Sequence, residues 1–411
     1  MIRTFLFAAA IGVFGSGCAV QELVVAEETE LNVATTSVDE ALLLDVGIVE
    51  FNPQIPDDNN PEKTGIYEDI RRAEAKYMPY HLKTTLQGTG HWGAVRVIPS
   101  ASAFTDVIIS GSIEKSDGEY IELQLTVSDA MGRHWFTRSY ETQTGLTSYS
   151  KRRDRRRDPY QKVFNDFAND LQQHAAAMEP RQLQQTRQVS ELKFFADMSP
   201  VPYNDYLAAD EEGIYSPVRL PAENDPSVQR MRQIRERDRL VVDTLNEHYA
   251  NFYYGIAIPY RNWRKNARAE TVKFRQEKRS AQMQALVGVV VLAGSMQIDT
   301  SGSSSRNTNN INRALQYQGI TRGFNTIFSA MQRNRDAGLH LEAIAELSES
   351  FGNEAAPMVV NVEGQERRLT GTAEAQYESW RRLLREIYEA ETGFSQTVEV
   401  GAPARAPEPT S

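Results

Sequence analysis

Residues 106–140 read DVIISGSIEKSDGEYIELQLTVSDAMGRHWFTRSY and carry the clearest structural signal in the chain. The stretch contains short segments with the β-branched composition and alternation typical of strands. Asp117-Gly118 and Met131-Gly132 separate these segments, and Asp-Gly is a strong hairpin signal. We therefore expect three consecutive strands, at residues 106–114, 120–128 and 135–140.

The segments on either side of this stretch complete an α/β domain over residues 40–178. Two further strands are expected at 42–51 and 94–98. The helical spacing of residues 66–87 predicts a long helix that Pro79 kinks or splits and that ends at Gly88-Thr89-Gly90. A helix over 159–178, apolar on one face, closes the domain.

The C-terminal region, residues 179–395, is predicted to be mostly helical. A helix begins at Asp225-Pro226 and runs to about Tyr254, because Gly255 and Pro259 mark a break before a second long helix. Other segments are expected to be helical at 182–195, 339–351 and 373–391, with a β-hairpin at 357–370 and a disordered tail at 396–411. The fold class is thus α+β, an N-terminal α/β sandwich-like domain followed by a helical region with one β-hairpin.

The N-terminus has the parts of a secretory signal peptide over residues 1–17: Arg3, a short apolar run and small residues. Cys18 follows, the single cysteine of the chain, and the arrangement resembles the lipobox of bacterial lipoproteins. That resemblance implies that Cys18 is acylated and, with Ala19 after it, that the protein is anchored on the periplasmic face of the outer membrane. Residues 18–39 would then be the lipidated residue and a flexible tether. The alternative is an ordinary signal peptide with an unmodified cysteine.

A second resemblance rests on the order of elements and on two short phrases, GAVRVIP at 93–99 and ISGSI at 109–113. Residues 40–178 are similar to the small α/β domain of several bacterial envelope proteins. These are the Tol-system periplasmic protein, the curli secretion lipoprotein, the lipoprotein activators of peptidoglycan synthases and the ABC-transport auxiliary lipoproteins. The resemblance implies assembly and contact with other envelope proteins, not catalysis.

Composition and motifs argue against several functional classes. The formal charge is −10, which disfavours nucleic acid as a partner because a phosphate backbone requires a basic face. The six histidines are scattered, and the sequence contains no phosphate-binding glycine loop and no serine nucleophile elbow. We therefore expect no enzyme activity, no cofactor and no metal.

Residues 151–157, KRRDRRR, form a local basic cluster in this acidic chain. One interpretation is a site for anionic headgroups or glycan phosphates, and the other is a solvated loop. The cationic residues are Lys151, Arg152, Arg153, Arg155, Arg156 and Arg157.

Residues 281–331 are predicted to form an apolar helical hairpin around a Ser/Asn-rich connection. Its first arm ends in ALVGVVVLAGSM at 285–296, too short to span a bilayer. Small residues would let two helices approach closely, and they are Ala281, Ala285, Gly288, Gly319 and Gly323. Three interpretations stay open: a buried hairpin, a homo-oligomer interface, or a membrane-inserting hairpin.

These observations lead to three hypotheses. The first is a non-enzymatic assembly or scaffold component of an envelope secretion, export or transport system. The second is a monomeric tethered regulator of a periplasmic enzyme, for which the Pro- and Tyr-rich loop 199–220 offers either a contact surface or internal packing. The third, a hydrolase, has no sequence feature in its favour.

Overall fold

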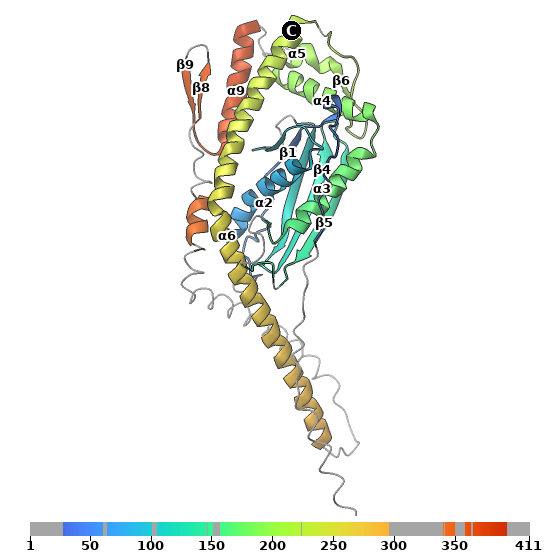
Figure 1. Ribbon diagram of the computed structural model, residues 1–411. Coiled ribbons are helices and arrows are strands. Elements are labelled where there is room, and N and C mark those ends of the chain that lie inside the picture. Colours follow the sequence, from blue (N-terminus) through green and yellow to red (C-terminus); the bar gives the residue numbers. More distant parts are fainter. Residues whose placement is uncertain are drawn as a thin grey trace, which may run out of the picture.

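The computed structural model describes residues 28–60, 64–100, 105–145, 147–150, 157–222, 224–295, 340, 342–349, 358–362 and 365–392. Its centre is a five-stranded sheet in the order β2-β1-β3-β4-β5 (Figure 1). Strands β1, β2 and β3 are parallel to one another, whereas β3, β4 and β5 form an antiparallel meander. The strands span Val46–Ile48 (β1), Val95–Val97 (β2), Val107–Ser116 (β3), Tyr120–Asp129 (β4) and His134–Gln143 (β5).

The two hairpin turns form where the sequence predicts them. Gly118 and Gly132 have φ angles of 82° and 92°, which glycine adopts without steric cost. In β4 every second side chain, from Ile121 to Asp129, is buried, and the alternate ones are partly or fully exposed. One face of the sheet is therefore apolar and covered, and the other is polar.

Helices α2 (Glu68–Thr89) and α3 (Gln161–Ala176) pack side by side on the covered face (Figure 1). Helix α2 is one helix with Pro79 inside it, so of the two expected effects of Pro79, a kink or a split, the split does not occur. The prolyl ring removes a single backbone hydrogen bond, and the neighbouring side chains of Met78, Tyr80 and His81 are all buried and hold the helix in place. Gly90, with a φ of 70°, ends α2 as predicted.

A smaller group of elements lies at one end of the sheet. It begins with the 3₁₀ turn η1 (Glu40–Leu42). Helix α4 (Pro180–Met198) is followed by short elements in the Pro-rich segment: α5 (Pro200–Tyr203), η2 (Asn204–Tyr206), β6 (Leu207–Ala209) and β7 (Tyr215–Pro217). Loop 199–220 is thus ordered and carries short regular elements.

Helix α6 runs without interruption over Pro226–Ser295, 70 residues. It begins as predicted, since the Asp225 carboxylate accepts a hydrogen bond from the backbone N–H of Ser227. The predicted break at Gly255 and Pro259 is wrong. Ile256 and Tyr260 on either side of Pro259 are 0% and 1% exposed, and this packing outweighs the one hydrogen bond that proline removes.

The C-terminal elements match their predictions. Strands β8 (Met358–Val362) and β9 (Gln365–Leu369) form an antiparallel hairpin. Residues 342–349 are helical, and α9 (Ala373–Thr392) packs on α6 and α4. The α+β class with one C-terminal hairpin is confirmed. A single cluster of contacting apolar side chains extends from the sheet and α2 to α6 and α9.

The segment expected to be a tether is fixed over its described part. The Thr29 carbonyl accepts a hydrogen bond from Asn165, and the backbone N–H of Asn32 donates one to Asn169 (2.7 and 2.8 Å). Both asparagines lie on α3. A stretch that is polar and without a clear period reads as a linker, but side-chain amides of α3 satisfy its backbone groups.

Candidate functional site

Helix α6 contacts both the sheet domain and the C-terminal helix α9. Its N-terminal half lies along the sheet domain (Figure 1). Near the sheet edge, Arg96 of β2 donates two hydrogen bonds to the Asp243 carboxylate of α6, at 2.6 and 3.0 Å. The amide oxygen of Asn246 accepts a hydrogen bond from the backbone N–H of Val97. The outer edge of β2 is therefore bonded to α6.

A buried ion pair fixes the same helix further along. Arg264 of α6 donates two hydrogen bonds to the Asp158 carboxylate just before α3, at 2.8 and 2.7 Å, and Arg264 is only 2% exposed. Its guanidinium group lies over the rings of Tyr160 and Tyr260. Burial by itself would raise the pKa of Asp158, but the adjacent charge of Arg264 and its hydrogen bonds lower that pKa well below the usual range.

A second buried carboxylate lies on α2. One oxygen of Glu74 accepts hydrogen bonds from Tyr260 of α6 (2.7 Å) and Ser116 of β3 (2.5 Å), and Arg71 lies 3.4 Å from the other oxygen. Burial raises the pKa of Glu74, and these partners only partly oppose it. Glu74 thus links α2, β3 and α6 at one point. We call Glu74, Ser116, Asp158, Tyr260 and Arg264 the α6 clamp.

His81 extends the clamp along α2. Its two ring nitrogens bond to Tyr253 of α6 (2.8 Å) and Gln161 of α3 (2.9 Å). Burial lowers the pKa of His81, although the negative charge of Asp158 opposes the effect. The imidazole is consequently held neutral between three helices.

The neutral state of the His81 imidazole predicts how the free energy of unfolding depends on pH. Its folded pKa is lower than its unfolded value of about 6.5, so the unfolded chain binds more protons, and the free energy of unfolding should fall as pH drops below about 6.5. We expect chemical denaturation between about pH 7.5 and pH 5 to show this loss, with a smaller pH dependence in His81→Gln. His174→Gln is the comparison variant and should reduce the pH dependence less than His81→Gln does. Burial also lowers the pKa of His174, but far less of that side chain is buried. Equal pH dependence in wild type and His81→Gln would contradict the assignment.

The tip of the β3–β4 hairpin also docks on α6. A Cβ atom built on Gly118 would lie 2.4 Å from the carbonyl oxygen of Arg264 and 2.8 Å from the backbone nitrogen of Arg268. Arg268 in turn donates a hydrogen bond to the Thr144 hydroxyl. The hairpin and the helix backbone thus touch directly, and glycine is required for this contact.

Beyond Arg268, helix α6 continues away from the sheet domain (Figure 1). Residues 269–295 stay helical, and at about 1.5 Å per residue this distal arm is about 40 Å long. Ala281, Ala285 and Gly288 of the predicted small-residue set lie on it. Their sequence spacing places them on one side of the helix. Gly319 and Gly323 lie outside the described residues, so the pairing of two arms stays a prediction.

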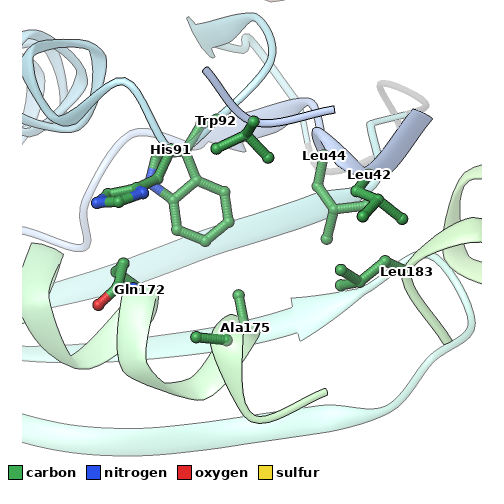
Figure 2. A pocket seen from close by; sticks show the side chains of 9 residues that line it. Leu42, Leu44, His91, Trp92, Gln172, Ala175 and Leu183 are labelled. Atoms are coloured by element: carbon green, nitrogen blue, oxygen red, sulfur yellow. The ribbon is translucent and has the colours of Figure 1, made fainter. Parts of the chain in front are cut away.

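A pocket of about 240 Å³ lies between α3, the start of α4 and the chain entering β1. Figure 2 shows His91, Trp92 and Gln172 on one side of it, with Leu42, Leu44 and Leu183 on the other. Its volume is below the roughly 300–1,000 Å³ typical of small-molecule sites. No carboxylate, hydroxyl or thiol group is among the described residues that line it. Such a lining can hold an apolar group but supplies no nucleophile with an adjacent base.

The other residues predicted to be functional are placed only in part. The signal segment 1–17, Cys18, residues 151–156 and the tail 396–411 lie outside the described residues. Arg157, the last residue of the basic cluster, is exposed and forms a 3.0 Å ion pair with Glu28, which is of the kind that contributes little to stability. Neither interpretation of the basic cluster is decided by this contact.

Loop 199–220 divides into a packed part and an exposed part. Tyr203 is 3% exposed and packs on Phe195, and the Arg219 guanidinium group lies over the Tyr206 ring. In contrast, three aliphatic side chains of this loop are more than half exposed, namely Val201, Val218 and Leu220. The aromatic residues at 203 and 206 therefore serve packing.

Sequence reasoning missed the α6 clamp. Asp158 appears in the sequence as an acidic residue beside a basic loop, and Arg264 as one charge in a helix rich in charges. The seven-residue spacing of Tyr253 and Tyr260 places both on one side of α6, and this is a local signal that could have pointed to the clamp.

Three further findings concern known classes of site and known proteins. Within the described residues, no cluster of histidine, cysteine and acidic side chains could hold a metal ion. Among those same residues, no helix combines the length and apolar character that a bilayer crossing requires. No protein-family model, curated protein or solved structure matches the chain.

Proposed function

We propose that this protein is a non-enzymatic, lipid-anchored assembly component of the bacterial outer membrane, facing the periplasm. The observation that carries the proposal is helix α6. One continuous helix is fixed to the sheet domain by the α6 clamp and extends a distal arm of about 40 Å. This arrangement gives the arm a defined direction relative to the domain.

The sequence of the distal arm supports a role in contact with another helix. Isolated helices are marginally stable in water, and most helical stability comes from packing of an apolar face. The last residues of the arm, 285–295, read ALVGVVVLAGS and contain no charge. An uncharged apolar segment of this kind requires another helix to pack against. The small residues Ala281, Ala285 and Gly288 would permit close approach of that helix.

The length of the N-terminal segment favours an assembly component over a far-reaching regulator. Glu28 and the residues after it are fixed to the domain. Cys18 and Glu28 are ten positions apart, and a fully extended chain of that length spans about 35 Å. A protein anchored through Cys18 would therefore keep its sheet domain close to the membrane surface.

The test is the native mass of the detergent-extracted mature protein, measured by light scattering with membrane fractionation. The chain has a mass of 46.3 kDa, and we expect a species of several copies in the outer-membrane fraction. Gly288→Leu should lower that mass, because a larger side chain separates the closely packed arms.

The matched control is Gly255→Leu on the same helix, where a Cβ atom would meet no heavy atom within 4 Å. Its native mass should equal that of the wild type. A wild-type mass of one chain would contradict the assembly role. So would an unchanged mass in Gly288→Leu.

A monomeric tethered regulator is the second candidate, and one observation favours it. Val201, Val218 and Leu220 expose apolar side chains on one loop, and exposed apolar patches often mark protein–protein contacts. A single-chain native mass, together with crosslinking from Val218 to a periplasmic enzyme, would support this candidate instead.

A further inference from the structure

The two edges of the sheet differ in how they are protected. At one edge, the backbone of β2 donates to Asn246 of α6, and Arg96 is paired with Asp243. At the other edge, β5 pairs only with β4 (Figure 1). Among the described residues, no backbone group forms a hydrogen bond to the outer side of β5. An edge strand left in this way is a template for pairing with another strand.

Strand β5 carries few of the devices that usually prevent such pairing. It is ten residues long, HWFTRSYETQ, and contains no proline and no lysine. The consecutive residues Thr137, Arg138 and Ser139 at its middle are all exposed. The single irregularity, a register shift opposite Val127 and Ser128, lies at its beginning, and the register with β4 is regular from Phe136 to Gln143.

The side chains of β5 are also held in position. Asp170 of α3 accepts hydrogen bonds from Arg138 (2.7 Å) and from the Tyr140 hydroxyl (2.9 Å). On the opposite face, the hydroxyl groups of Thr137 and Thr126 bond to each other at 2.9 Å. A strand whose side chains are ordered before contact loses less entropy when a second strand is added.

We propose that β5 pairs with β5 of a second copy of this chain, antiparallel about a two-fold axis at Ser139, to form a continuous sheet across both copies. In this register Ser139, a small residue, lies opposite Ser139 of the second copy across the axis. Thr137 lies opposite Glu141 of the second copy, and Arg138 lies opposite Tyr140 of the second copy. These pairs combine a hydroxyl with a carboxylate and a cation with an aromatic ring. The register that opposes Arg138 to itself brings like charges together and is disfavoured.

Because the β2 edge is protected, we expect β5 to pair with β5 of a second copy and the assembly to end at two copies of the chain. Of the two edge strands in the described sheet, only β5 is open, because α6 covers β2. An isologous contact between two identical edges uses both open strands and leaves none for a third chain. The contact is separate from the distal arm and does not rest on the proposed function.

The test uses the full mature chain with Cys18→Ser, which removes its single cysteine, and with Gly288→Leu to separate edge pairing from arm contacts. Ser139→Cys then places one thiol at the two-fold axis. Opposite Cα atoms in an antiparallel pair are about 4.5–5.5 Å apart, within the range of a disulfide. Mild oxidation should give a covalent dimer. Ser110→Cys, on the same face two strands further in, should not.

A second pair of variants tests the contact without oxidation. In the same Cys18→Ser and Gly288→Leu background, Ser139→Lys places two like charges at the axis and should convert a dimer into a monomer by light scattering, with unchanged circular dichroism. Ser110→Lys adds the same charge away from the edge and should stay dimeric.

Three results would overturn the proposal. One is disulfide formation in the Ser139→Cys variant that is no faster than in the Ser110→Cys variant. Another is a native mass that Ser139→Lys leaves unchanged. The third is crosslinking of the thiol introduced by Ser139→Cys to a different polypeptide in envelope extracts while the purified protein stays monomeric, which would assign the edge to another partner.

Discussion

Replacing Arg264 by methionine should lower the free energy of unfolding by about 3–5 kcal/mol. The substitution keeps much of the length of the side chain but leaves the Asp158 carboxylate buried without its counter-charge. Arg264 is what holds the pKa of Asp158 below its usual range in the native protein, and burial alone raises that pKa. Without Arg264 the group would be either charged and unpaired or protonated at a cost at neutral pH. Urea denaturation followed by circular dichroism measures the effect.

Arg232→Met is the matched control, since Arg232 lies on the same helix and pairs with Glu191 at 2.9 Å while about half exposed. Its cost should stay below about 1 kcal/mol. The double variant Arg264→Met with Asp158→Leu should recover much of the lost stability, because removal of both charges leaves neither one unpaired. If Arg264→Met and Arg232→Met cost the same, the ion pair does not fix α6.

Gly118→Ala should have the second large effect, because it adds an atom at the point where the hairpin touches α6. The new Cβ would lie 2.4 Å from the Arg264 carbonyl oxygen, an atom of the helix backbone that cannot rotate away. The hairpin and the helix must then separate, and overpacking of this kind costs about 1–3 kcal/mol. Alanine at a φ of 82° adds backbone strain.

Gly213→Ala separates the two contributions. Gly213 has a φ of 81°, but a Cβ atom there would meet nothing within 4 Å, so this variant reports backbone strain alone. We expect Gly118→Ala to lose about 1–3 kcal/mol more than Gly213→Ala in thermal or chemical unfolding. Hydrogen exchange should also become faster in α6 near Arg264. Equal losses in the two variants would mean that the hairpin tip does not depend on α6.

The sequence by itself determined the elements whose signals are local. The alternation in 120–128 and the Asp117-Gly118 turn predict the β3–β4 hairpin, because the period of two and the turn chemistry are properties of neighbouring residues. The same holds for the start of α6 at Asp225-Pro226 and for the C-terminal hairpin. These signals were sufficient for the α+β class.

Only the tertiary structure decided how these elements are joined. Asp158 and Arg264 are 106 residues apart, and Glu74 and Tyr260 are 186 apart, so no local pattern connects them. The continuity of α6 through Pro259 depends on side chains buried against α2, and the fixed course of residues 28–32 depends on amides of α3. Local sequence sets what each segment can form, whereas the free energy of burying a charge, a ring or a strand edge depends on a partner that only folding brings close.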